Sequence, residues 1–208
     1  MRGKFIAFEG IDSEVITDQT RRMSEWLRSK TKTVITTREP TDGPIGAQIR
    51  LILDKRLLVS ELPQAAFFVV DRVDHLYRRD DGILAELERE HWVVCARYLL
   101  SAYAYQSDIA PFEWLVEINR LCPWPDLMVF VDTTVESSLE RMVRQEGFDS
   151  VRIEERLAEL TSRRESFLNA INRCRSQGKE VSIVDGNQPA ANIHRSCKSL
   201  VDRINPER

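Results

Sequence analysis

Short apolar runs and longer amphipathic stretches alternate along the chain. The apolar runs are continuous and rich in β-branched residues, which is typical of strands buried on both faces of a sheet. We expect strands at residues 4–9, 33–37, 92–95, 127–132 and 181–184. The first run is followed at once by Gly10, as expected where a strand enters a loop.

The stretches between the runs carry apolar residues at helical spacing, as Met23, Trp26 and Leu27 do in the first of them. We expect helices at residues 17–29, 46–53, 63–78, 81–90, 99–104, 113–121, 136–145, 152–173 and 190–203. This alternation predicts an α/β fold, with a parallel sheet and helices on both of its faces. Ligands of such sheets bind at the carboxyl ends of the strands, so chemistry is expected in the segments that follow them.

Composition and charge narrow the class of protein. The 208 residues are 42% apolar and 30% charged, which fits one well-packed domain over residues 1–208. A net charge of −3 gives no basic footprint for DNA or RNA. Glu9 interrupts the first apolar run, and no run is long enough to cross a bilayer. We therefore expect neither a signal peptide nor a membrane segment.

The cysteines give a further indication of compartment. Four cysteines are present, without a CxxC pair and without a cluster of cysteines and histidines. A zinc site or a disulfide framework is therefore not expected. Reduced thiols of this kind fit a cytoplasmic protein.

Five motifs follow one another at the predicted strand ends and on one helix. They are FEGIDSEVIT at 8–17, TREP at 37–40, FVVDR at 68–72, ARYLLSAYAYQ at 96–106 and PDLMVFVD at 125–132. In this order and at these spacings they resemble the thymidylate kinases, P-loop enzymes that phosphorylate dTMP with ATP. The resemblance covers nearly the whole chain. It implies a P-loop kinase-type three-layer sandwich, with a five-stranded parallel sheet flanked by helices and a small lid at about 141–156.

The first motif departs from the family pattern FEGxDGxGKTT. The corresponding donor-loop positions are Gly10, Ser13, Glu14, Val15, Ile16 and Thr17. The family lysine places its charge on the donor phosphates, whereas Ile16 has no charge and no hydrogen-bond donor. Val15 resists the backbone conformations that glycine adopts freely. Glu14 adds a like charge that would repel a phosphate by roughly 4 kcal/mol at about 4 Å and an effective dielectric of about 20.

Two further segments concern the part of the site that would bind ATP, the phosphate donor. The family motif DRY has an aspartate near the metal and the phosphates, and this position is Ala96 here. Family lids cover the phosphates with arginines, and the corresponding segment here keeps Arg141, Arg144 and Arg152. The usual acid before the second lid arginine is Val151. The alternative interpretation is that these arginines form an ordinary solvated helix face.

The part of the site that would bind dTMP, the phosphate acceptor, keeps most of the residues that the family uses there. The resemblance implies a nucleoside monophosphate site formed by Asp12, Arg38, Phe68, Arg72, Arg97, Ser101, Tyr105 and Gln106. Arg38 and Arg97 would hold the phosphate, because the forked guanidinium matches phosphate geometry. Phe68 would stack on the base and Arg72 would hydrogen-bond to it. Tyr105 would pack near the sugar and the base, with Gln106 at the base edge and Asp12 near the sugar or the phosphate.

Structural interpretations of the same residues stay open. Phe68 lies in an apolar helix, where a phenylalanine is more often part of the core. Arg38 and Arg97 each follow a buried strand, where a charge must be paired or used, and Glu39 and Asp71 are available partners.

Three functions are compatible with the sequence. The first is a thymidylate-kinase-like protein that has lost phosphoryl transfer and acts by nucleotide binding, regulation or scaffolding. The second is an active kinase with an atypical donor loop, in which Asp12 and Arg97 are the catalytic candidates and Mg²⁺ and ATP the cofactors. The third is a structural partner without a nucleotide site. The donor-loop residues favour the first over the second, and the retained arginines favour it over the third.

The resemblance also implies a partner. Thymidylate kinases form homodimers through helices that flank the sheet, so we expect a symmetric homodimer. The candidate contact surfaces are residues 63–73 and 99–105. A further protein partner is compatible with a regulatory role.

Overall fold

The centre of the fold is a parallel β-sheet. The structure, a computed structural model, describes the backbone of residues 2–146 and 150–205, and the side chains of this part outside 145–152. Within it the strands form one five-stranded sheet in the order β2-β3-β1-β4-β5. The strands are β1 (Phe5–Glu9), β2 (Val34–Arg38), β3 (Trp92–Ala96), β4 (Leu127–Asp132) and β5 (Ser182–Asp185). The sheet predicted from the apolar runs is therefore confirmed.

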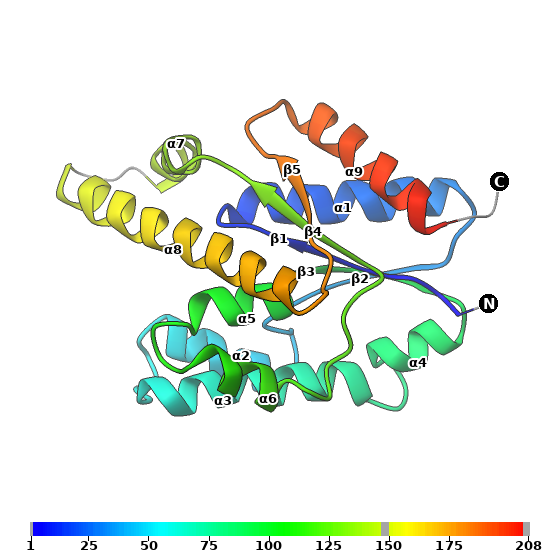
Figure 1. Cartoon of the computed structure of the whole chain (residues 1–208), viewed down its shortest axis with the longest axis horizontal. Coiled ribbons are helices and arrows are strands. Elements are labelled where there is room, and N and C mark those ends of the chain that lie inside the picture. Colours follow the sequence, from blue (N-terminus) through cyan, green and yellow to red (C-terminus); the bar gives the residue numbers. More distant parts are fainter. Residues whose placement is uncertain (1, 147–149, 206–208) are drawn as a thin grey trace.

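Helices connect the strands and cover both faces of the sheet (Figure 1). They are α1 (Ser13–Ser29), α2 (Pro44–Leu53), α3 (Glu61–Tyr77), α4 (Ile83–Glu88), α5 (Leu99–Tyr105), α6 (Phe112–Ile118), α7 (Val135–Glu146), α8 (Ser150–Ser176) and α9 (Ala190–Ile204). Every helix expected from the sequence is present. The largest difference in a helix start is at α1, which begins at Ser13 and not at Thr17.

The central strand β1 divides the interior into two apolar cores. Phe5 and Ala7 face one core, which is completed by side chains of α4, α5, α6 and α8. Ile6 and Phe8 face the other, which is completed by α1 and α9. This alternation follows from the pleat of a strand, in which successive side chains point to opposite faces. Figure 1 shows α1 and α9 together on one side of the sheet and α5 on the other.

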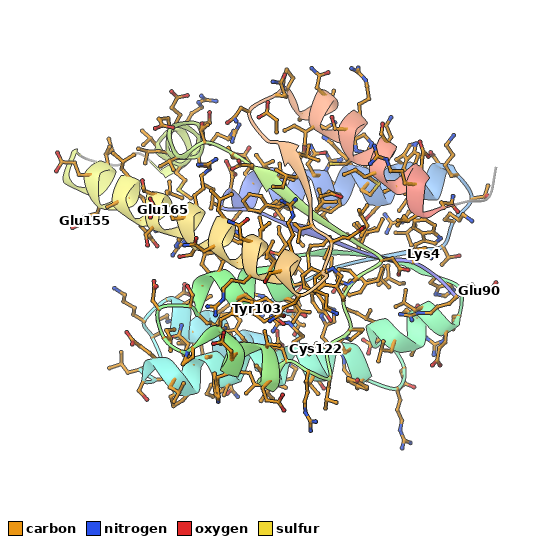
Figure 2. The ribbon with its side chains drawn as sticks, viewed as in Figure 1. Lys4, Glu90, Tyr103, Cys122, Glu155 and Glu165 are labelled. Carbon is orange, nitrogen blue, oxygen red and sulfur yellow. The ribbon has the colours of Figure 1, made fainter. Side chains whose placement is uncertain are left out.

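The carboxyl ends of the strands point toward the side of the molecule where α1, α7 and α8 begin (Figure 1). Lys4 and Glu90 lie at the opposite end of the sheet from Glu155, which stands near the start of α8 (Figure 2). The segments singled out in the sequence are thereby brought to one edge of the sheet, the edge at which parallel α/β proteins bind their ligands.

Two expectations about surfaces have a structural outcome. Residues 99–104 on α5 are buried, because this short helix packs beneath α8, so the predicted contact surface at 99–105 is wrong. Tyr103, labelled in Figure 2, belongs to this buried set. None of the helices within the described residues is long and apolar enough to cross a membrane.

Candidate functional site

The amino terminus of α1 is capped by a side chain of the protein itself. Asp12 is the N-cap residue, and its Oδ1 accepts hydrogen bonds from the Glu14 and Val15 N–H groups, both at 3.1 Å. The Ile16 N–H donates to the Asp12 carbonyl at 3.1 Å. The first N–H groups of a helix have no partner within the helix and are the groups that can bind an anion. Here the N–H groups of Glu14, Val15 and Ile16 are engaged.

The second oxygen of the same carboxylate holds α7. Arg141 Nη1 donates to Asp12 Oδ2 at 2.5 Å, and only 6% of the Asp12 side chain is exposed. One carboxylate therefore joins the start of α1 to an arginine of the predicted lid. Of the other predicted lid arginines, Arg144 is exposed, and the side chain of Arg152 lies outside the described residues.

Ile16 points into the protein. It is 1% exposed and belongs to the apolar core between the sheet and helices α1 and α9. Gly10 makes room for it, since a Cβ at Gly10 would lie 3.1 Å from Ile16 Cδ1 and 2.7 Å from the Val131 carbonyl oxygen. Val15 is also buried, whereas Glu14 is exposed in the first turn of α1. The side chain at the family lysine position thus contributes to packing, and the nearby exposed charge is negative.

A cavity of about 640 Å³ opens beside this region. Its lining includes six of the eight residues predicted for the nucleoside monophosphate site: Phe68, Arg72, Arg97, Ser101, Tyr105 and Gln106. Gln106 is buried, and its Oε1 has no hydrogen-bond partner within the described residues. A buried acceptor left open in a cavity is suited to a ligand donor. The size and the mixed lining fit a small organic ligand.

Arg97 stands at one end of the cavity, directly after β3. Its guanidinium donates to the Gly10 carbonyl at 3.0 Å, to Ser13 Oγ at 2.7 Å and to Tyr105 Oη at 2.9 Å. These acceptors are neutral oxygens, so the guanidinium keeps its positive charge available for an anion. Arg97 also has φ of +66°, a left-handed conformation that is uncommon for a residue with a side chain. Such conformations concentrate at ligand-binding sites, which supports a functional interpretation.

Glu9 lies beneath Arg97 at the end of β1 and is fully buried. It accepts hydrogen bonds from the Tyr98 N–H at 2.9 Å, the Ser101 N–H at 3.1 Å and Ser101 Oγ at 2.5 Å. Burial raises the pKa of Glu9 above its ordinary value, although Ser101 and the Arg97 charge act in the opposite direction. The main effect of Glu9 is to fix the start of α5, the helix that carries Ser101 and Tyr105.

Arg72 is held by the protein. Its guanidinium donates to Glu39 Oε2 at 2.8 Å and to Asn119 Oδ1 at 2.7 Å, and the side chain is 2% exposed. Burial works against its charge, and the Glu39 carboxylate nevertheless raises the pKa of Arg72. Glu39, one of the two acids considered as partners for Arg38 and Arg97, therefore pairs with Arg72 instead. The other candidate partner, Asp71, instead accepts hydrogen bonds from Thr41.

Two predicted residues lie outside the cavity lining. The Arg38 side chain is 60% exposed and pairs with Asp42 at 2.5 Å, next to the end of β2. Asp12 is used at the start of α1, as described above. Of Arg38 and Arg97, the two arginines predicted to hold the phosphate, Arg97 alone lines the cavity, and it contacts Ser13 of α1.

Sequence reasoning missed one wall of the cavity. Glu159, Ser162, Arg163 and Ser166 line it from α8. Their spacing of i, i+3, i+4 and i+7 places them on one face of a helix, and this polar stripe was the signal in the sequence. The lining also has apolar side chains, among them Leu53, Phe68 and Ile109. An aromatic base against the apolar side chains and polar groups toward α8 would suit this arrangement.

The chain also has a clear relation to known proteins. The family model described as thymidylate kinase matches residues 8–197. The chain belongs to the thymidylate kinase family. It is 32% identical to a probable thymidylate kinase of Pyrococcus abyssi, with 97% of each chain covered. It is 30% identical to a thymidylate kinase of Nitrosospira multiformis, with 98% of this chain and 99% of the relative covered. Membership confirms the resemblance, and the parallel sheet with its flanking helices is consistent with the P-loop kinase fold.

Proposed function

We propose that this member of the thymidylate kinase family no longer transfers phosphoryl groups from ATP and acts as a nucleotide-binding regulatory or scaffolding protein. The observation that carries the proposal is the degenerate donor loop at the start of α1. Its N–H groups are bonded to Asp12, and Ile16 is buried in the core. Phosphoryl transfer depends on positioning and charge neutralisation, and both are weakened by these features.

The groups available at this loop do not fit Mg²⁺ and ATP. The phosphates of ATP need free N–H groups and a positively charged side chain. Here Asp12 accepts hydrogen bonds from the N–H groups, and a buried Ile16 stands where the resembled motif has lysine. Glu14 is exposed in the same turn, and Ala96 stands where the family has a carboxylate. No group of three or more potential metal ligands is present among the described residues. We therefore derive no step through a metal ion or ATP.

The ligand that we propose for the cavity is dTMP or a related nucleoside monophosphate. Arg97 would hold the phosphate, Phe68 would stack on the base, and Gln106 would accept a hydrogen bond from the base edge. Arg72 would contribute mainly by stabilising the lining of the cavity, because its guanidinium already donates hydrogen bonds to Glu39 and Asn119. Hydrogen bonds to charged groups contribute roughly 1.5–3 kcal/mol each. The forked Arg97 guanidinium can donate two such bonds, and together with stacking on Phe68 and the bond to Gln106 they would support an affinity of about a micromolar, roughly −8 kcal/mol.

We place the protein in the cytoplasm as a single domain, with 141–156 as its lid segment. Its four cysteines are unbridged and buried, as a reducing compartment favours. The Asp12–Arg141 ion pair, which joins the first residue of the lid segment to the start of α1, supports this lid assignment.

The active-kinase alternative keeps one specific observation in its favour, the charged and strained Arg97 beside the donor loop. It requires the Asp12–Arg141 pair to separate and the first turn of α1 to open. The third alternative, a structural partner without a nucleotide site, is favoured by the apolar face of α3. Leu62, Val70 and Tyr77 are exposed along this face. The same face is our candidate surface for a homodimer.

Calorimetric titration separates the three functions. We expect heat of binding with dTMP at micromolar concentrations and none with Mg·ATP up to millimolar concentrations. Binding of both ligands would favour the active kinase, and binding of neither would favour the structural partner. Arg97→Ala should abolish the dTMP signal, and Arg38→Ala, which removes an arginine outside the cavity, is the matched control.

A further inference from the structure

The ring of Tyr105 is held mainly by α8. Phe167 contacts it edge to face, with ring centroids 5.3 Å apart and planes at 81°. The Arg163 guanidinium lies over the same ring, 5.1 Å from its centroid. Arg163 and Phe167 are four residues apart, so they project from the same face of α8. Tyr105 therefore has both an apolar and a cationic contact from one helix.

The hydroxyl of Tyr105 holds Arg97. Arg97 Nη1 donates to Tyr105 Oη at 2.9 Å, and the Arg97 guanidinium also lies 5.5 Å from the ring centroid. The backbone of Arg97 is fixed by its N–H, which donates to the Phe8 carbonyl at 2.8 Å. A long side chain on a fixed backbone needs further contacts to keep one orientation. The Tyr105 hydroxyl supplies one of these contacts on the cavity side.

We propose that Arg163 is a positioning residue for the phosphate end of the cavity. It holds the Tyr105 ring, and the Tyr105 hydroxyl in turn orients the Arg97 guanidinium. This inference rests on the proposed nucleotide site and adds the α8 residue that controls it. Glu159 pairs with both Arg156 and Arg163, which keeps the Arg163 guanidinium over the ring.

The test compares a ligand that has a phosphate with one that lacks it. Affinities for dTMP and thymidine are measured by calorimetry for the wild type and for Arg163→Gln. We expect the affinity for dTMP to fall about three- to tenfold, as for loss of one cation–π contact, while that for thymidine is unchanged. Arg163→Lys, which keeps a charge over the ring, should recover most of the loss.

A matched control lies on the same helix. Arg173 stands over the ring of Phe112, 4.4 Å from its centroid, and pairs with Glu113, but it does not line the cavity. Arg173→Gln therefore removes the same kind of contact from α8 and should leave both affinities unchanged. An equal loss of dTMP affinity in both variants would overturn the proposal in favour of general loosening of α8.

A double-mutant cycle tests the path through Tyr105. Tyr105→Phe keeps the ring and removes the hydroxyl, so Arg163→Gln should have no further effect on dTMP binding in that background. Additive losses would overturn the proposal, because Arg163 would then contact the ligand directly. Binding of dTMP that is unaffected by Arg163→Gln would overturn this inference alone. Absence of dTMP binding in the wild type would overturn the proposed nucleotide site and this inference with it.

Discussion

Asp12 illustrates how a single carboxylate changes the chemistry of a loop. It accepts two N–H groups at the start of α1 and pairs with Arg141 of α7. Each contact is an ordinary stabilising interaction of a folded protein. Together they place a negative charge of the protein at the helix terminus that would otherwise be open to a phosphate.

The two contacts of Asp12 can be separated by substitution. Asp12→Ala removes the cap and the ion pair, and we expect the free energy of unfolding to fall by about 1–2 kcal/mol. Asp12→Asn keeps a good N-cap and loses only the charge, so it should cost less. Urea unfolding of the three proteins measures both effects. An alanine variant as stable as the wild type would contradict the description of this site.

Glu9 predicts a dependence of stability on pH. Burial raises the pKa of Glu9 in the folded state above its ordinary value of 4.5, so the folded protein binds this proton more tightly than the unfolded chain. The stabilisation is fully present below about pH 4.5 and is lost as the pH rises through the folded value. Glu9→Gln cannot ionise. We therefore expect its free energy of unfolding to rise relative to that of the wild type between pH 4.5 and pH 7.

The measurement is the free energy of urea unfolding of both proteins across this pH range. The difference between the two proteins at each pH reports the ionisation of Glu9. Other carboxyls, such as Asp18 and Asp185, have a lowered pKa and act in the opposite direction, but they contribute equally to both proteins. A difference that does not change with pH would contradict the burial of an ionisable Glu9.

At the scale of elements, α1 is the part that differs most from the sequence expectation. Residues 13–16 belong to the helix because Asp12 caps it and because no flexible glycine stands among them. Ile16 is consequently a core residue. The resembled motif has a charged lysine at this position, which is expected to face a phosphate. The burial of Ile16 depends on packing against the sheet and α9, and a motif gives no information about that packing.

Restoring the family lysine alone should therefore harm the protein. Ile16→Lys places a charge in the core between α1 and α9, and we expect the free energy of unfolding to fall by roughly 3 kcal/mol or more. Ile16→Val, a conservative control, should cost about 1 kcal/mol. Thermal and urea unfolding measure both variants. A lysine variant that is as stable as the valine variant would show that this position is open to solvent.

For the rest of the fold and the site, too, the sequence predicts features that leave a pattern along the chain and misses those that depend on packing. Strand and helix positions followed from apolar periodicity, since buried strands and amphipathic helices leave direct marks in a sequence. Phe68, Arg97 and Tyr105 were found because they belong to motifs with fixed spacing. Arg163 was missed because a polar stripe on a long helix has the same pattern on a solvated face. Arg38 lies outside the cavity lining and pairs with the nearby Asp42, a contact that the motif does not predict.

At the scale of the whole molecule, α3 presents an unusual surface. Leu62, Val70 and Tyr77 are each about half exposed on one face of this helix, and Leu58 just before it is 88% exposed. A row of large apolar side chains on a helix marks an interaction surface more often than a free one. This face fits the homodimer that we propose.

We expect the wild type to have twice the 24.1 kDa mass of the chain in light scattering at micromolar concentration. Val70→Glu places a charge in the centre of the face and should give a monomer. Leu157→Glu changes an exposed leucine on α8 and should leave the mass unchanged. A monomeric wild type would contradict the proposed dimer.

The most direct test of the central proposal is the rate of dTMP phosphorylation with Mg·ATP, measured as ADP formation. The thymidylate kinase of Nitrosospira multiformis, assayed in parallel, is the positive control. Because Asp12 occupies the N–H groups of α1 and Ile16 is buried, we expect ADP formation no faster than in the absence of dTMP. Turnover of about 1–100 per second, the usual range for kinases, would contradict the proposal.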